Sequence, residues 1–276
     1  MPCLTPGWSP TRRGFLRFLC IAALGAITGG GCGLRPAGPV VIACAASNRG
    51  VMEAIIADYR AATGREVVAS YGPSQSLLAA IEIAPAADLF LPADESFLVS
   101  ARDRGLVGDE VFPLAEMEAV VAVRRGNPRG VRTAADLLAP DLRVALADPE
   151  SAAIGGLARR LFEAAGLWRP LAAKAVVFTA SVTEVAGAVK LGAADAGVVY
   201  DVVLRDFPDL EAVALPELAG GRSRVVLGVV AATSRPAAAA EFARFVASPS
   251  HGLARYRERG FHPVSPPVSP ASDRSR

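Results

Sequence analysis

The sequence has few of the side chains with which enzymes usually carry out catalysis. Its only histidines are His251 and His262, both near the C-terminus, where we assign them surface, capping or other structural roles. It has no Gly-x-Ser-x-Gly, His-Glu-x-x-His or Cys-x-x-Cys motif, so nucleophilic and metal-hydrolase mechanisms lack their parts. We therefore predict that the chain is not an enzyme.

The chain also lacks an excess of charge of either sign. It has 29 basic and 27 acidic residues, and its only lysines are Lys174 and Lys190. The arginines are spread along the sequence with no basic run beyond the N-terminus, which indicates solvated surfaces. This balance argues against a nucleic-acid-binding surface.

Cysteine is scarce as well. Cys3, Cys20 and Cys32 lie in the N-terminal segment, which leaves Cys44 alone at the end of a predicted strand. No structural disulfide is therefore expected. Cys44 is predicted to be a small buried hydrophobic residue.

Residues 1–32 have the layout of a bacterial export signal. The paired Arg12 and Arg13, followed by Gly-Phe-Leu, resemble the twin-arginine export motif. The apolar run Phe18–Ile27 is too short for a comfortable membrane span. The alternative is an ordinary export signal that happens to contain two arginines.

Cys32 follows three glycines and resembles a lipoprotein cleavage site, which predicts a periplasmic or lipid-anchored exported protein. Gly29 stands where such sites usually have an apolar residue, so plain cleavage to a soluble periplasmic protein is the alternative. Residues 33–39 are predicted to be a linker. Residues 263–276, rich in Pro, Ser and Arg, are predicted to be a disordered tail.

Short apolar segments alternate with amphipathic ones between residues 40 and 262. Strands are predicted near Val40–Ala43, Glu66–Ser70, Asp88–Leu91, Ala119–Arg124, Leu142–Ala147, Lys174–Phe178, Ala196–Tyr200 and Val225–Val230. Helices are predicted near Gly50–Thr63, Ser76–Ile83, Glu95–Arg104, Thr133–Leu138, Ile154–Ala165, Val182–Leu191, Ala237–Val246 and Gly252–Arg259. This alternation predicts an α/β fold of mostly parallel sheets with helices on both faces.

Two strand segments begin new sets of strands and helices without a helix of ordinary length before them. They are Glu116–Arg124 and Val225–Val230, and this pattern suits chain crossings between two lobes. We predict that residues 40–118 form lobe 1, that 119–229 form lobe 2 and that 230–262 return to lobe 1. A single eight-stranded sheet is the alternative.

Two predicted strand-to-helix joints carry serines. Within Glu66–Ile81 a strand passes through Ser74 into a helix, and Val40–Ala43 passes into Ser47 before the next helix. Such a joint leaves the first N–H groups of the helix unpaired at the carboxyl edge of the sheet, where they can bind an anion. The alternative for both serines is plain N-capping.

Three later positions lie at comparable joints. Asp148-Pro149-Glu150 leads to a helix near Ile154, Thr179-Ala180-Ser181 leads to Val182, and Tyr200 ends a strand. The alternatives are ordinary turns and a core tyrosine. We expect Asp94 to cap the helix that follows it.

Taken in order, several segments resemble the periplasmic molybdate-binding proteins, the substrate-binding components of molybdate ABC transporters. The resemblance spans about Val40 to Phe261 and rests on Ala45-Ala46-Ser47, Ser70–Leu77, Pro85–Asp94, Gly126-Asn127-Pro128, Ala147–Glu150, Gly192–Tyr200 and Gly260-Phe261. It implies a two-lobed periplasmic-binding-protein fold with the ligand in the cleft between the lobes.

The resemblance also implies a ligand shell. Hydroxyl donors would come from Ser47, Ser74 and Tyr200, and backbone donors from near Ile154 and Val182, with Ala46 and Ser47 as possible additions. Molybdate is fully deprotonated at neutral pH, so it only accepts hydrogen bonds. The family usually has Pro-Ala-Gly at the helix entry where this chain has Ala153-Ile154-Gly155, and the bulkier Ile154 can change the size of the site.

We therefore predict a monomeric solute-binding protein that captures molybdate or tungstate and delivers it to an ABC permease. No cofactor or direct metal ligand is expected. The alternatives are the same fold binding sulfate or an organic anion, a ligand-sensing lipoprotein, and an exported hydrolase. The hydrolase would require His251 or His262 within hydrogen-bond reach of Ser47 or Ser74.

Overall fold

The computed structural model describes residues 38–264 of the chain. The predicted export signal at residues 1–32, Cys32, all but the end of the linker and the last twelve residues of the chain lie outside this range. None of the helices within residues 38–264 combines the length and the apolar character that a membrane crossing needs.

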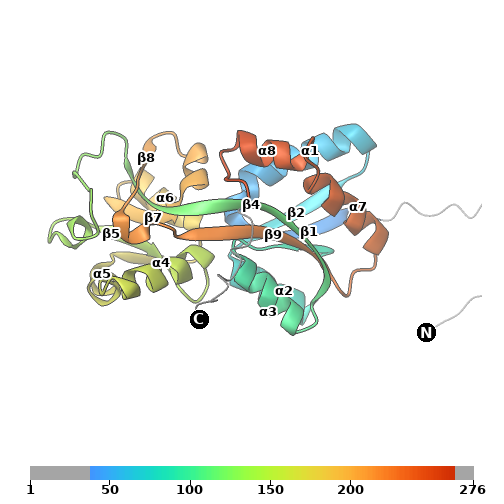
Figure 1. Ribbon diagram of the computed structural model, residues 1–276, viewed down its shortest axis with the longest axis horizontal. Coiled ribbons are helices and arrows are strands. Elements are labelled where there is room, and N and C mark those ends of the chain that lie inside the picture. The colour runs from blue at the N-terminus through green and yellow to red at the C-terminus, as the bar shows by residue number, and fades with distance from the viewer. Residues whose placement is uncertain (1–37, 265–276) are drawn as a thin grey trace, which may run out of the picture. The chain divides into compact units, whose positions relative to one another are not determined.

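Nine strands form the sheet at the centre of the fold (Figure 1). Eight of them follow the order β2-β1-β3-β9-β4-β7-β5-β6, and β8 pairs with β4 outside this path. Their bounds are β1 Val40–Ala45, β2 Val67–Gly72, β3 Leu89–Leu91, β4 Val107–Arg124, β5 Val144–Ala147, β6 Val177–Thr179, β7 Ala196–Tyr200, β8 Leu210–Val213 and β9 Arg222–Val230.

The sheet has two halves that share the long strand β4. In the half we call lobe 1, β2, β1 and β3 are parallel, and β9 runs antiparallel between β3 and the first part of β4. In the half we call lobe 2, β5, β6 and β7 are parallel, and the last part of β4 pairs antiparallel with β7 and β8. The sequence left open two lobes or a single sheet, and the structure has features of both. The strand path is continuous, as in a single sheet, while the parallel strands form two separate groups, as in two lobes. The lobe boundaries at residues 118, 229 and 262 remain predictions.

Helices cover both faces of each half (Figure 1). In lobe 1, α1, α7 and α8 lie on one face while α2 and α3 lie on the other; in lobe 2, α6 lies opposite α4 and α5. The bounds are α1 Arg49–Thr63, α2 Ser74–Ile83, α3 Glu95–Asp103, α4 Ala153–Ala164, α5 Trp168–Lys174, α6 Val182–Lys190, α7 Pro236–Val246 and α8 Gly252–Glu258. Short 3₁₀ turns are η1 Ala46–Asn48, η2 Asp136–Leu138, η3 Asp201–Asp206 and η4 Pro216–Leu218.

Helix α1 shows how the sequence pattern produces this packing. Its buried residues, Val51, Met52, Ile55 and Tyr59, recur at the spacing of one helix face. The helix ends at Gly64, whose φ of 70° lies in the left-handed region that glycine adopts without strain. The inner parallel strands β1, β3, β5 and β7 are buried almost throughout, as expected for strands covered on both faces, whereas the edge strands β2 and β6 are more exposed. Cys44 is buried in β1 as predicted.

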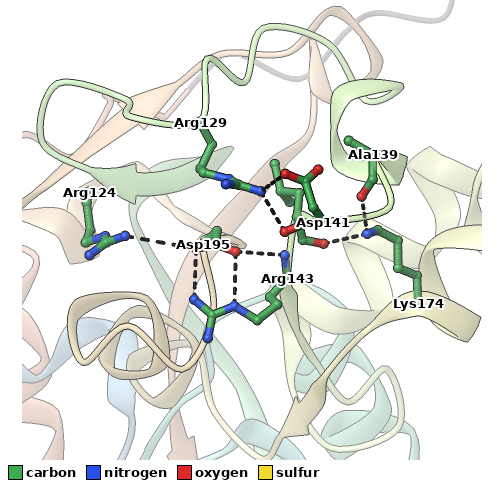
Figure 2. Close-up of polar contacts among 8 residues, drawn as sticks. Arg124, Arg129, Ala139, Asp141, Arg143, Lys174 and Asp195 are labelled. Atoms are coloured by element: carbon green, nitrogen blue, oxygen red, sulfur yellow. Dashed lines mark hydrogen bonds and ion pairs between the residues drawn. The ribbon is translucent and has the colours of Figure 1, made fainter.

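In each lobe, a buried carboxylate lies at the amino ends of the parallel strands and forms hydrogen bonds and an ion pair there. Just before β7, Asp195 accepts hydrogen bonds from the backbone N–H and the guanidinium of Arg143, at 2.9–3.1 Å (Figure 2). Just before β3, Asp88 accepts from the backbone N–H of Val41 and from the Arg235 guanidinium. The Arg143 guanidinium lowers the pKa of Asp195, which keeps this carboxylate ionised.

Several predicted bounds were wrong. Strand β4 begins at Val107 instead of Ala119, and the helix predicted over Thr133–Leu138 is only the 3₁₀ turn η2. Lys174 ends helix α5 instead of opening a strand, so β6 is confined to Val177–Thr179. Helix α5 and strand β8 were not predicted.

Candidate functional site

A small, partly open cavity lies where the carboxyl ends of the parallel strands of both lobes meet. Five strand-to-helix joints and the end of β7 surround it. The lining residues are Ala45, Ala46, Ser47, Gly72, Pro73, Ser74, Ala93, Ala152, Ala153, Ile154, Ser181, Val182 and Tyr200. The carboxyl edge is where open α/β sheets usually bind ligands.

All five residues predicted for the site, Ser47, Ser74, Ile154, Val182 and Tyr200, line this one cavity. Lobe 1 contributes the two serines, from η1 and the first turn of α2. Lobe 2 contributes the other three, from the starts of α4 and α6 and the end of β7. All five are at least nine-tenths buried.

The two serine oxygens already accept hydrogen bonds from protein groups. Ser47 Oγ accepts from the Asn48 side-chain nitrogen at 3.3 Å, and Ser74 Oγ accepts from the backbone N–H of Ala93 at 3.1 Å. A hydroxyl has one proton and two lone pairs, so each serine keeps its proton for a further partner. Both serines are therefore suited to donate to an acceptor in the cavity.

Tyr200 is held in a similar way by a residue of another strand. Its hydroxyl lies 2.8 Å from the Oγ of Ser223, which is fully buried on β9. When Ser223 donates in this pair, the phenolic proton is free for the cavity. Burial raises the pKa of Tyr200 above its usual range, so the phenol stays protonated.

Three helices begin at the cavity without a side-chain cap. No side chain at the N-cap positions of α1, α2 and α4 accepts a hydrogen bond from the helix, and no acidic residue lies in their first turns. Plain N-capping by Ser47 and Ser74 is thus not what the structure shows. By contrast, Asp94 caps α3 as predicted, and Ser181 caps α6. At α1 the N–H of Arg49 donates to the carbonyl of Ala46, so it is the first N–H groups of α2 and α4 that leave a partial positive charge beside the cavity.

The cavity has no charged lining. Among the residues that the structure describes around it, the only titratable side chain is that of Tyr200. Polar character comes from hydroxyl groups and from peptide dipoles, and alanine, isoleucine and valine supply the rest of the wall. Such a shell offers hydrogen-bond donors without a fixed ionic partner.

Gly155 sets the position of α4 against this cavity. A Cβ at this position would lie 2.5 Å from the carbonyl oxygens of Ala147 and Asp148. Only glycine therefore allows the first turn of α4 to approach the end of β5 this closely. The neighbouring Ile154 is 1% exposed and faces the cavity as a bulky apolar wall.

The two lobes touch beside the cavity. The backbone N–H of Gln75, in the first turn of α2, donates to the carbonyl of Ser151 at 3.4 Å. Helix α6 of lobe 2 also packs against η1 of lobe 1. The structure is thus one in which both walls of the cavity are close enough to contact the same small ligand.

Neither histidine reaches the serines of the cavity. His251 Nδ1 lies 3.1 Å from the hydroxyls of Ser248 and Ser250, and His262 Nε2 lies 2.7 Å from Asp201 Oδ2. The arrangement that the hydrolase alternative required is therefore not found within residues 38–264. Of the metal-binding residue types in this range, Glu118, Asp201 and His262 bring ligand atoms within 4.8 Å of one another, and none of the three lines the cavity.

Sequence reasoning missed the residues that hold the site residues in place. Ser223 and Asn48 contact the predicted donors, and no motif pointed to either of them. Ala93 lies within a segment that carried the family resemblance, but its contact with Ser74 gives no local signal. These contacts join residues of different elements, so they become visible only in three dimensions.

Known proteins resemble the chain in both sequence and fold. The molybdate-binding protein ModA of Mycobacterium tuberculosis (strain ATCC 25618 / H37Rv) is 29% identical over 247 residues, which cover 87% of this chain and 93% of that protein. The periplasmic molybdate-binding protein of Azotobacter vinelandii superposes with a TM-score of 0.71 at 20% identity, covering 82% of this chain and 99% of that one.

The sulfate-binding protein SubI of Mycobacterium tuberculosis H37Rv superposes with a TM-score of 0.74, also at 20% identity, covering 83% of this chain and 88% of that one. At this identity the two solved structures show a shared fold and confirm the predicted two-lobed α/β class. The family model for bacterial extracellular solute-binding proteins matches residues 40–262, and the chain belongs to that family.

Proposed function

We propose that the protein captures a tetrahedral oxyanion, molybdate or tungstate, outside the cytoplasm and delivers it to an ABC permease. The observation that carries the proposal is the arrangement of three cavity hydroxyls. Ser47, Ser74 and Tyr200 each have a protein partner on the oxygen, and the lining around them has no charged side chain.

A shell of this kind matches a fully deprotonated dianion. Such an anion has acceptors only, so each hydroxyl proton and each free helix N–H can donate to it. The N-termini of α2 and α4 add favourable dipoles. A carboxylate in the lining would repel the anion, and none is found in it among residues 38–264.

The choice of anion is supported by sequence more than by fold. The Mycobacterium relative that matches 87% of the chain is described as binding molybdate, whereas solved structures with this fold include both a molybdate-binding and a sulfate-binding protein. Sulfate is therefore the second candidate. Because it is the smaller anion, the bulk of Ile154 at the cavity wall would govern the choice between the two.

Closure of the lobes would couple binding to transport. The donors come from both lobes, so the anion satisfies all of them only when the lobes approach, and binding shifts the population toward the closed form. The contact between Gln75 and Ser151 is one bond that opening would break. We further propose a monomer that is periplasmic or held at the membrane by a lipid on Cys32.

Titration calorimetry of the purified, anion-free protein tests the proposal. We expect tight binding of molybdate and tungstate, and weak or no binding of sulfate and phosphate. Ser47→Ala or Ser74→Ala should weaken binding about 10- to 100-fold, because each removes a hydrogen bond to a charged acceptor. Ser96→Ala is the matched control, because this exposed hydroxyl bonds Asp94 and does not line the cavity. An absence of heat with all four anions would contradict the proposal.

A second titration series tests the size of the site. Ile154→Val removes one methylene from the cavity wall, so it enlarges the site and should widen the preference for molybdate over the smaller sulfate. An unchanged preference would mean that Ile154 does not set the size limit. Tight sulfate binding by the unaltered protein would favour the second candidate.

A further inference from the structure

A chain of hydrogen bonds connects the last helix to the cavity. The Tyr256 hydroxyl, on α8, donates to Asn48 Oδ1 at 3.2 Å, and Asn48 Nδ2 donates to Ser47 Oγ at 3.3 Å. Asn48 is fully buried and Tyr256 is 1% exposed. This series of hydrogen bonds thus runs through the interior of lobe 1 and ends at the Ser47 hydroxyl, which lines the cavity.

Asn48 is not used for the role that its position would suggest. It is the N-cap residue of α1, and asparagine is among the preferred N-caps because its side chain can accept from the helix backbone. No such bond is present. The amide instead spans Tyr256 and Ser47, so these two contacts account for its orientation.

The Tyr256 hydroxyl determines which group donates in each of these hydrogen bonds. The Tyr256 hydroxyl donates to Asn48 Oδ1, and burial raises the pKa of Tyr256 well above the usual range, so the phenol keeps the proton that it donates. It holds the oxygen of the Asn48 amide toward α8, and the –NH₂ group then faces Ser47. Because Asn48 can only donate in this orientation, Ser47 must direct its own proton elsewhere.

The other two hydroxyls are fixed differently. Ser74 accepts from a backbone N–H, which no side-chain substitution can reverse. Tyr200 pairs with another hydroxyl, and either member of that pair can donate. Of the three, Ser47 is the hydroxyl whose polarity depends on the orientation of a side-chain amide.

We propose that Asn48 and Tyr256 are positioning residues that make Ser47 a donor and thereby bias the cavity against oxyanions that carry a proton. The inference rests on the proposed function and deepens it. A hydrogen phosphate ion has the same double charge as molybdate, but one of its oxygens bears a proton that needs an acceptor. With Ser47 polarised as a donor, this hydroxyl does not supply that acceptor.

The test compares molybdate with phosphate at a mildly alkaline pH, where phosphate is a dianion with one proton. In Asn48→Asp the carboxylate accepts the Ser47 proton, so Ser47 presents a lone pair to the cavity. The added charge repels both dianions alike. The ratio of the molybdate and phosphate dissociation constants therefore reports the effect of the proton that only hydrogen phosphate carries. We expect the preference for molybdate over phosphate to fall at least 10-fold.

Tyr256→Phe is the second variant. It keeps the ring, which packs edge-on against Phe261 with centroids 4.8 Å apart, and removes only the hydroxyl that fixes the amide. We expect molybdate affinity to fall about 3- to 10-fold, comparable to the loss of one neutral hydrogen bond, with a smaller loss for phosphate. The matched control is Tyr59→Phe, because Tyr59 is equally buried and its hydroxyl bonds Glu241 away from the cavity.

The outcomes separate the two proposals. Failure of the unaltered protein to bind any oxyanion overturns the proposed function. Binding by the unaltered protein, with a molybdate-to-phosphate ratio that neither variant changes, overturns the positioning role alone. Equal effects of Tyr256→Phe and Tyr59→Phe on the ratio would also overturn it, since a general loss of core packing would then explain both. Thermal denaturation confirms that each variant is folded.

Discussion

The two ends of the parallel strands use opposite chemistry. At the amino ends, each lobe buries a carboxylate against an arginine: Asp88 with Arg235 in lobe 1, and Asp195 with Arg143 in lobe 2. At the carboxyl ends, the cavity is lined by hydroxyls, peptide groups and small apolar side chains without any charge. The same strands thus end in ion pairs on one side and in neutral donors on the other.

This difference separates stability from binding. The carboxylates at the amino ends accept backbone N–H groups that the sheet leaves unpaired, so their charge contributes to the fold. A charge at the carboxyl ends would act on the ligand instead. Among the described residues of the lining, hydroxyl protons and helix dipoles are offered to an anion without a charged side chain, and this favours an anion without protons.

Placing a charge at the carboxyl ends should have the largest effect. Ser74→Asp sets a carboxylate against the bound dianion. At about 4 Å and an effective dielectric constant near 20, each pair of like charges costs about 4 kcal/mol. Calorimetry should therefore show molybdate affinity reduced by more than about 1000-fold. Ser74→Asn has nearly the same shape without the charge and should lose far less. Similar losses in the two variants would mean that shape, not charge, excludes the anion.

Removing the charge at the amino ends should act on stability instead. Asp195→Ala leaves the Arg143 backbone N–H and guanidinium without their acceptor, and it should lower the free energy of unfolding by about 2–3 kcal/mol. Denaturant unfolding measures this. Asp141→Ala is the control, because this 77%-exposed carboxylate also pairs with an arginine, Arg129, and should cost less than about 1 kcal/mol (Figure 2). Molybdate affinity should be unchanged in Asp195→Ala and in Asp141→Ala. A large change in either would mean that the charges at the amino ends also act on binding.

The free energy of unfolding should depend on pH through the same carboxylate, that of Asp195. Arg143 lowers the pKa of Asp195 below its unfolded value of about 4. The stabilisation is therefore fully present above the unfolded pKa and is lost as pH falls through the folded pKa. Unfolding measured between about pH 2 and 6 should show a shallower acid decline in Asp195→Asn than in the unaltered protein. Parallel curves would assign the acid sensitivity to other carboxylates.

Much of this architecture could be predicted from sequence because the signals are local. Buried parallel strands appear as short apolar runs, and α1 carries its apolar face at helical spacing. Once the strands are known to be parallel, their carboxyl ends must share one edge. Ser47, Ser74, Ile154, Val182 and Tyr200 could therefore be placed together, although their contact with a ligand remains a prediction.

The segments that sequence missed lack such signals. The first part of β4 contains Pro113 and the exposed Asp109 and Glu110, so it resembles a loop, and its strand form depends on pairing with β9. Helix α5 buries only Leu171 and has no capping residue, so no periodicity marks it. The contact between Asn48 and Tyr256 joins residues 208 positions apart, which no local pattern specifies.

The smallest expected effect is that of pH on binding. Histidine is the residue type that usually changes charge between about pH 6 and 8, and neither His251 nor His262 lines the cavity. Burial raises the pKa of Tyr200, which stays protonated throughout this range. Molybdate affinity measured by calorimetry should therefore change less than about 2-fold, since no lining group gains or loses a proton. If the change is larger, the variant to measure next is His262→Gln, because His262 bonds Asp201, the sequence neighbour of Tyr200. If molybdate affinity still changes with pH in His262→Gln, a group in or near the cavity lining gains or loses a proton. The contrast between charged amino ends and an uncharged cavity at the carboxyl ends would then be wrong.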